Sequence, residues 1–205
     1  TTQKPNQVID AISDFYQNHN SNIHRAVHAL AEESTEAFEN TRDMVAKFLN
    51  IEDSREIIFV RGTTEGINLV AYAWGRDNVK EGDIIVTTEY EHHSNIVPWQ
   101  LLTQEKKAQL KYIDIDDNGE LMLDQLDDYL STGKVKLVTF SHMSNVLGTI
   151  SPVEKIISKC KNAGVKVLID GAQSVPHMKI DLNKIDCNFY VFSAHKMLGP
   201  TGVGV

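Results

Sequence analysis

Cysteine is scarce in this chain of 205 residues, which contains only Cys160 and Cys187. Two cysteines are too few for a disulfide framework, and they lack the close spacing of paired metal ligands. The chain is also long enough to build a core without such crosslinks. We therefore expect a protein that folds without disulfides or a bound metal and works in the reducing cytoplasm.

Long apolar runs and an excess of basic side chains are also absent. No run approaches the roughly 20 apolar residues that a membrane-spanning helix needs, and the N-terminus lacks the basic and apolar regions of a secretory signal. The 20 basic and 28 acidic side chains give a formal net charge of −8, whereas nucleic-acid-binding proteins present a basic face. We therefore expect neither a membrane nor a nucleic acid as a partner.

The two ends of the sequence lack the features of a complete protein. There is no initiator methionine, and the last residues, Gly202–Val205, resemble the start of a strand. A strand cut at its start would leave its neighbours in a sheet unpaired. We therefore expect this chain to be part of a longer protein.

Short apolar runs alternate with longer amphipathic stretches along most of the chain. Several runs are continuously apolar, which is typical of strands in a parallel sheet that helices cover on both faces. This alternation predicts an α/β fold with a mostly parallel sheet and helices on both faces. The predicted strands cover Glu56–Val60, Asp83–Thr87, Leu110–Ile115, Val135–Phe140, Val165–Ile169 and Phe189–Phe192.

Two helical stretches, near Asn6–Asn18 and Ala29–Asn50, precede the first predicted strand. No internal repeat and no linker rich in glycine, serine or proline divides the rest of the chain. We therefore distinguish an N-terminal helical segment, residues 1–50, from a ligand-binding α/β domain, residues 51–205.

Polar, small or ionisable residues follow most of the predicted strands. In an open α/β sheet the ligand lies beyond the carboxyl ends of the strands, so these residues are the candidates for a site. They form five groups, at residues 61–66, 89–95, 141–148, 170–174 and 193–196.

Four of these groups have chemistry that suits a single cofactor. The turn at residues 61–66 starts a helix whose free N–H groups favour a phosphate, although it has neither the P-loop nor the dinucleotide-binding glycine pattern. Asp170 could hold a proton on a ligand nitrogen, and a histidine of the pair His92–His93 could stack on a flat ring or move a proton. Lys196 could form a Schiff base with an aldehyde. Each feature alone also has an ordinary structural explanation, but together they indicate pyridoxal 5′-phosphate.

Six motifs in the same order resemble the fold-type I pyridoxal-phosphate enzymes of the class V aminotransferase group. Within that group, the chain is most similar to the cysteine desulfurase and selenocysteine lyase family of the SUF type. The resemblance covers essentially the whole chain and implies the large domain of that fold, without its C-terminal small domain. The motifs are HRAVHAL (24–30), FVRGTTEGINLVA (59–71), EHHSNIVPWQ (91–100), HMSNVLGT (142–149), VLIDGAQSVPH (167–177) and FYVFSAHKMLGPTGVGV (189–205).

The resemblance implies a role for each of several residues. Lys196 would hold the cofactor as an internal aldimine, and Asp170 would pair with its pyridine nitrogen. Gln173 would bond its phenolic oxygen, while His93 would stack on the ring and take part in proton transfer. The phosphate would be held by Thr63, Thr64, Ser193 and His195, and the substrate region would contain Asn145, His24 and Arg25.

The reaction implied by the resemblance converts L-cysteine into L-alanine and passes the sulfur to an enzyme cysteine as a persulfide. The sulfur then goes to an acceptor protein of the SUF type for iron–sulfur cluster assembly, and the intact enzyme is a homodimer. L-Selenocysteine is an alternative substrate. Neither Cys160 nor Cys187 matches the position of the family's catalytic cysteine, which lies in the C-terminal small domain. We therefore expect both cysteines to be core residues, and the isolated chain to be inactive.

Two other kinds of function remain open at this point. Kynureninases, amino-acid epimerases and isopenicillin-type enzymes use the same aspartate, glutamine and lysine, although EHHSNIVPWQ and SNVLGT favour a desulfurase. A non-catalytic α/β binding module or an NAD-binding Rossmann domain is the other alternative. The setting of Lys196 argues against the former, and the missing G-x-G-x-x-G pattern argues against the latter.

Overall fold

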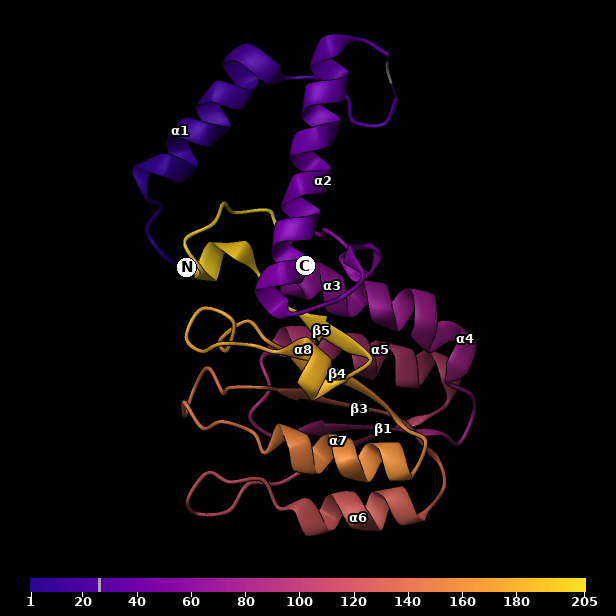
Figure 1. Cartoon of the computed structure of the whole chain (residues 1–205). Helices are drawn as coiled ribbons and strands as arrows, with labels where there is room; N and C mark the ends of the chain where they lie inside the picture. The colour runs from indigo at the N-terminus through magenta and orange to yellow at the C-terminus, as the bar shows by residue number, and fades with distance from the viewer. Residues whose placement is uncertain (26) are drawn as a thin grey trace.

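The computed structural model describes residues 1–25 and 27–205. Within this part of the chain, five parallel strands form one sheet in the order β2-β1-β3-β4-β5 (Figure 1). The sheet confirms the predicted α/β class. Its strands are β1 Ile84–Thr88, β2 Gln109–Ile113, β3 Val135–Ser141, β4 Lys166–Asp170 and β5 Phe189–Val191.

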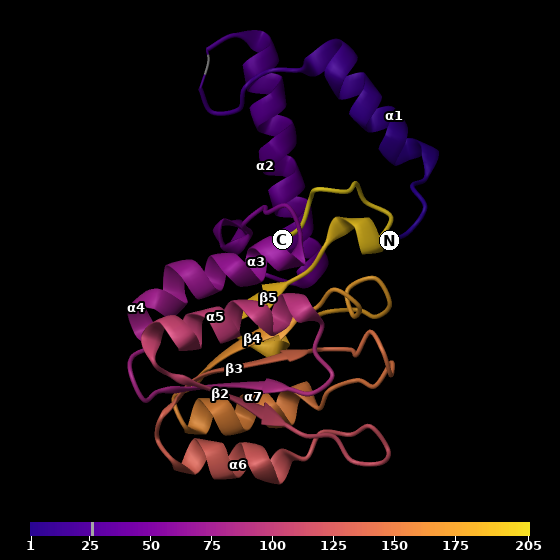
Figure 2. The ribbon, with the colours of Figure 1, turned by 180° about the vertical axis from the view of Figure 1, so that it is seen from behind.

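Helices cover both faces of the sheet, as the continuously apolar strands predict. Figures 1 and 2 show α3 (Thr63–Val70), α4 (Arg76–Asn78) and α5 (Val97–Lys106) on one side of the sheet. The opposite side carries α6 (Leu123–Ser131) and α7 (Val153–Asn162).

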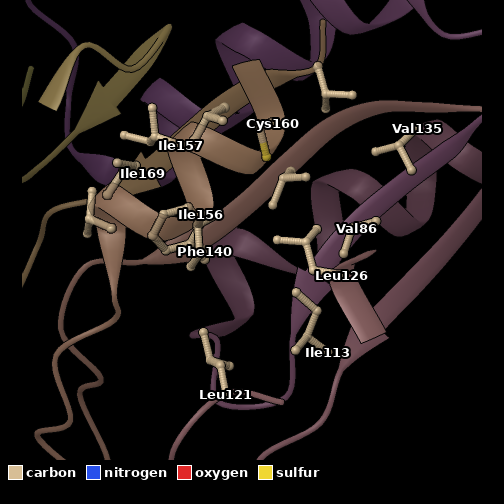
Figure 3. Packing of buried hydrophobic residues seen from close by; sticks show 14 of the residues in the cluster. Val86, Ile113, Leu121, Leu126, Val135, Phe140, Ile156, Ile157, Cys160 and Ile169 are labelled. Atoms are coloured by element: carbon tan, nitrogen blue, oxygen red, sulfur yellow. The ribbon is translucent and has the colours of Figure 1, made fainter. Parts of the chain in front are cut away.

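Side chains alternate between these two helical layers along each central strand. Ile85 of β1 and Leu137 of β3 pack with Trp99 of α5 in one buried cluster. Their neighbour Val86 packs on the opposite face with Ile156 of α7, in the cluster shown in Figure 3. Each fully buried aliphatic side chain contributes roughly 1.5–3 kcal/mol to folding.

The N-terminal residues form two helices that lead away from the sheet in both views (Figures 1 and 2). Helix α1 (Asn6–Asp14) continues into a π-helical turn, Phe15–His19, and α2 spans Ala29–Leu49. The end of α2 packs against the domain through Leu49, which is buried beside Ile57. Within the described residues, no helix has the length and apolarity that crossing a bilayer would demand.

The predicted strand Glu56–Val60 is wrong. Residues Ser54–Glu56 form a 3-10 turn, and only Val60 pairs with another segment, through an antiparallel bridge to Gly204. The apolar character of this stretch has another cause, because Ile57 is buried under α2 while Ile58 is 57% exposed. The other five predicted strands are confirmed, with ends that differ by at most two residues.

A hollow of about 690 Å³ lies beside β5, on the side facing residues 57–60. Its lining includes Ile58, Val60, Phe189 and Val205, and none of the candidate site residues. The last residues enter this region as an extended segment, because Gly204 bridges both Val60 and Ser193. The hollow is therefore a feature of the sheet edge and is separate from the strand-end site described next.

Two short helical elements lie on either side of β5 in the chain. Helix α8 covers Leu182–Ile185 and begins after Asp181, whose side chain accepts a hydrogen bond from the Lys184 N–H. The turn Ala194–Lys196 follows β5 and carries the candidate Schiff-base lysine. Helix α8 therefore precedes β5 in the chain, and the turn with Lys196 follows its carboxyl end.

Candidate active site

The carboxyl ends of β3, β4 and β5 lie at the same end of the sheet. In the parallel register, Ser141 of β3 is level with Asp170 of β4, and Asp170 is level with Val191 of β5. The segments that follow these strands therefore start side by side. This arrangement gathers the groups that the sequence places after each strand.

Thr63 and Ser193 form the base of the predicted phosphate site. The Thr63 N–H donates to Ser193 Oγ over 2.8 Å, and the two hydroxyl oxygens are also 2.8 Å apart. Both residues are buried, whereas Thr64, next in the first turn of α3, is exposed. These hydroxyls and the start of an eight-residue helix form a donor set that suits a phosphate.

Asp170 ends β4 with only 5% of its surface exposed. Its Oδ1 accepts a hydrogen bond of 2.9 Å from the Ala172 N–H, and among the described residues its Oδ2 has no hydrogen-bond partner. Burial raises the pKa of this carboxyl, and the hydrogen bond from the Ala172 N–H and the positive charge of Lys196 partly offset that effect. The free oxygen fits a protonated ring nitrogen, because a cationic N–H donor would compensate for burying the charge.

Lys196 is half-buried in the turn that follows β5. Within the described residues no carboxylate pairs with its ammonium, which leaves this lysine open to a ligand. The turn is tight, because a Cβ on Gly199 would lie 2.8 Å from the Ala194 Cβ. Burial lowers the pKa of the neighbouring His195, and the charges of Lys196 and Lys4 lower it further.

His93 lies exposed in a 3-10 turn, His93–Asn95, that follows β1. The preceding His92 caps this turn, since its Nδ1 accepts a hydrogen bond from the Ser94 N–H. The two imidazole rings are nearly perpendicular, at 84°, with centroids 6.1 Å apart. His92 is therefore occupied in the turn, while the ring of His93 remains free to stack on a ligand.

Gln173 and Asn145 lie in loops at the same edge of the sheet. Gln173 is half-buried in the turn after β4, and its backbone carbonyl lies 2.6 Å from Nδ1 of His177. Asn145 is exposed in the loop after β3, where Ser144 Oγ accepts hydrogen bonds from two following N–H groups. Their roles toward cofactor and substrate remain predictions.

His24 and Arg25 are not gathered with the strand-end groups. His24 has a left-handed backbone (φ 57°), and its Nε2 lies 3.0 Å from Oε1 of Glu39 in α2. Arg25 is exposed in the same segment. This segment leads to the N-terminal end of α2, which is far from the sheet in both views (Figures 1 and 2). A role of these residues in substrate binding remains a prediction.

Glu91 lies in the candidate group at residues 89–95, but the sequence analysis gave it no role of its own. This carboxylate is 9% exposed, and four donors surround it: Thr88 Oγ1, Asn95 Nδ2, and the N–H and Oγ of Ser141, at 2.6–2.8 Å. Burial raises the pKa of Glu91 to about 7, against the effect of these hydrogen bonds. Glu91 therefore ties the turn that carries His93 to the end of β3.

A buried chain of hydrogen bonds through Tyr190, which the sequence analysis did not predict, supports the Asp170 loop. His142 Nδ1 lies 2.8 Å from the Tyr190 hydroxyl, which lies 2.7 Å from Ser174 Oγ. Burial lowers the pKa of His142 and raises that of Tyr190, which favours the neutral form of each. The Tyr190 ring also packs so closely on Gly171 that any Cβ there would overlap it.

Both cysteines pack in the interior, as predicted. Cys160 of α7 is fully buried in the cluster shown in Figure 3, and Cys187 is half-buried against the same cluster. Burial raises the pKa of each thiol to about 12. Burial therefore disfavours the reactive thiolate form of both cysteines at neutral pH.

Comparisons with known proteins agree with this geometry. A model of the aminotransferase class-V family matches residues 1–205. Cysteine desulfurases of Synechococcus elongatus and Enterobacter sp. are 54% and 53% identical to the whole chain, which covers 33% and 50% of their lengths. The chain therefore spans a third to a half of the curated relatives it matches.

Solved structures show the same similarity at the level of the fold. The apo structure of a cysteine desulfurase from Thermococcus onnurineus NA1 superposes with a TM-score of 0.93 at 38% identity, over all of this chain and 50% of that one. An Escherichia coli cysteine desulfurase gives a TM-score of 0.88 at 36% identity, over 98% of this chain and 50% of its own.

Proposed function

Because the chain belongs to the class-V aminotransferase family, we propose that it is the cofactor-binding part of a pyridoxal 5′-phosphate-dependent cysteine desulfurase. One observation carries the proposal. Thr63 and Ser193, which are 130 residues apart in the sequence, form a buried hydrogen-bonded pair. This pair lies at the same end of the sheet as Asp170 and Lys196. Phosphate donors, a buried carboxylate and a lysine without a counter-ion are what this cofactor needs.

Bound pyridoxal phosphate supplies an aldehyde and a ring that withdraws electrons from a substrate amino acid. Lys196 holds the aldehyde, and Asp170 keeps a proton on the ring nitrogen through a charge-assisted hydrogen bond. His93 would stack on the ring and take part in proton transfer, while Gln173 would bond the phenolic oxygen. The phosphate is held by Thr63, Thr64, Ser193 and His195.

We further propose L-cysteine as the substrate, with Asn145 near its carboxylate. The reaction breaks the carbon–sulfur bond and forms a sulfur–sulfur bond, so that cysteine and an enzyme thiol give alanine and an enzyme persulfide. The packing of Cys160 and Cys187 supports a thiol outside residues 1–205 as the acceptor. From there the sulfur would pass, in the cytoplasm, to a SUF-type acceptor protein for iron–sulfur cluster assembly.

A homodimer of the intact enzyme is part of the proposal. Large apolar side chains on the two N-terminal helices are exposed, including Ile9 (48%), Tyr16 (69%), Met44 (62%) and Phe48 (54%). Single exposed apolar residues are common on monomers. Several of them on one pair of projecting helices support the proposal that a second subunit packs against these helices.

Chemical trapping tests the proposal. The full-length protein is incubated with pyridoxal 5′-phosphate and reduced with borohydride, and mass spectrometry then locates the pyridoxyl group. We expect the label on Lys196 and none in a Lys196→Ala variant, with Lys184→Ala, which alters an exposed lysine, as the matched control. A label on other lysines alone, in a folded protein, would contradict the cofactor proposal.

A substrate assay tests the reaction separately. The loaded full-length protein is supplied with L-cysteine or L-selenocysteine, and alanine and the released sulfide or selenide are measured. Alanine formed from L-cysteine supports a desulfurase. Alanine from L-selenocysteine alone would identify a selenocysteine lyase instead, and no alanine from either would exclude both.

A further inference from the structure

The first residues of the chain bind the turn that carries Lys196. The Thr2 N–H and Thr2 Oγ1 both donate to the His195 carbonyl, at 2.8 and 3.2 Å. The Leu198 N–H donates in turn to Thr2 Oγ1 over 2.8 Å. Lys4 Nζ also reaches the His195 carbonyl, at 3.3 Å. Figures 1 and 2 show the N-terminus beside this turn.

The Thr2 hydroxyl replaces one hydrogen bond of the turn itself. The Lys196 and Met197 N–H groups donate to the carbonyls three residues earlier, at 3.3 and 2.9 Å. The next bond of this series would join the Leu198 N–H to the His195 carbonyl. Instead the Thr2 hydroxyl lies between these two groups. It accepts a hydrogen bond from the Leu198 N–H and donates its single proton to the His195 carbonyl.

The turn needs this outside support because its own backbone is strained. Leu198 adopts a left-handed conformation (φ 69°) that is costly for a branched side chain. Such a conformation persists only where surrounding contacts enforce it. Thr2 contacts the residues on both sides of Lys196–Met197, so its hydroxyl fixes the path of the backbone at the lysine.

We propose that Thr2 is a positioning residue for Lys196, and that its hydroxyl sets the turn so that the lysine amine meets the aldehyde of the cofactor. This inference rests on the proposed function. It adds a residue that touches neither cofactor nor substrate and lies at the opposite end of the chain from the lysine.

The test separates reaction of the lysine from binding of the cofactor. In the full-length protein, Thr2→Val keeps the side-chain shape but removes the hydroxyl, and Thr2→Ser keeps the hydroxyl. Thr1→Val, at an exposed neighbouring threonine, is the matched control. Two quantities are measured: the rate at which borohydride-trappable pyridoxyl forms on Lys196, and the affinity for pyridoxine 5′-phosphate, which lacks the aldehyde.

We expect Thr2→Val to slow labelling of Lys196 roughly tenfold, the effect of losing one or two hydrogen bonds. Its affinity for pyridoxine 5′-phosphate stays unchanged, and Thr2→Ser and Thr1→Val label at the wild-type rate. Wild-type labelling by Thr2→Val would overturn the inference. So would an equal loss of labelling and of pyridoxine 5′-phosphate binding, which would indicate general damage to the site. A wild-type protein that takes no label on Lys196 would instead contradict the proposed function, and this inference with it.

Discussion

Among single residues, the buried Glu91 has the clearest consequence for pH dependence. Burial raises its pKa from 4.5 to about 7, so the folded protein binds a proton more tightly than the unfolded chain does. Between these two values the folded state carries more protons than the unfolded state. The contribution of Glu91 to the free energy of unfolding is therefore largest at low pH and falls as pH rises through this window.

A Glu91→Gln variant should lose this pH dependence. We expect the free energy of unfolding of the wild type, minus that of the variant, to fall as pH rises from 4.5 to about 7. The steepest slope should approach about 1.4 kcal/mol per pH unit. Denaturant unfolding across this range measures it, with Glu89→Gln at an exposed neighbouring position as control. Parallel curves for wild type and Glu91→Gln would show that Glu91 does not titrate in this window.

Single residues also show the limits of reading the site from the sequence. Lys196, Asp170 and Thr63 were predictable because each stands after a strand and has side-chain chemistry that suits a ligand. Glu91 was not, since an acidic residue after a strand usually lies on the surface. Its burial depends on Ser141, fifty residues away, whose N–H and Oγ both donate to it. The sequence contains the donors but does not show that they converge.

At the scale of elements, the strands were predictable where their apolar pattern reflects burial on both faces. β1 and β3 are short, mostly apolar and buried strands, and helices cover both of their faces. Residues 56–60 have a similar pattern, but they pair only at Val60, with Gly204 from the other end of the chain. The apolar pattern of residues 56–60 reflects the packing of Ile57 under the end of α2 and not burial within a sheet, which explains the wrong prediction.

The packing of the β4 loop against β5 gives a second prediction. A Cβ at position 171 would overlap the Tyr190 ring, which hydrogen bonds to His142 and Ser174 hold in place. Gly171→Ala should therefore lower the free energy of unfolding by about 1–3 kcal/mol. Denaturant unfolding measures the loss in the wild-type background and in Tyr190→Ala. If the overlap is the cause, the loss shrinks in Tyr190→Ala; an equal loss in both backgrounds would point to the backbone instead.

At the scale of the whole molecule, the packing of both cysteines in the core supports the proposal that the sulfur acceptor lies outside residues 1–205. Under the proposed desulfurase function, we expect a full-length protein carrying Cys160→Ala and Cys187→Ala to form as much alanine and enzyme persulfide as the full-length protein that keeps both cysteines. The reason is that both thiols are packed in the core and their pKa values are raised to about 12. Alanine release and mass spectrometry of the persulfide measure this.

The control for the double variant is its fold, since removing core sulfur atoms costs stability. Circular dichroism and denaturant unfolding must show that the variant is folded at the assay temperature. A folded double variant that forms no persulfide would place the sulfur acceptor within residues 1–205. The packing of both cysteines would then have to open during turnover.

The contact between Thr2 and the Lys196 turn also sets an order of events during translation. Thr2 and His195 are 193 residues apart in the sequence, so Thr2 leaves the ribosome long before its partner residue is synthesised. At about 5–20 residues per second, that delay is on the order of 10 to 40 seconds. A nascent chain cannot lock its lysine turn during this interval, and a polypeptide released early never can. In the proposed enzyme, Thr2 can therefore position Lys196 for the cofactor only after the turn at residues 194–196 has been synthesised.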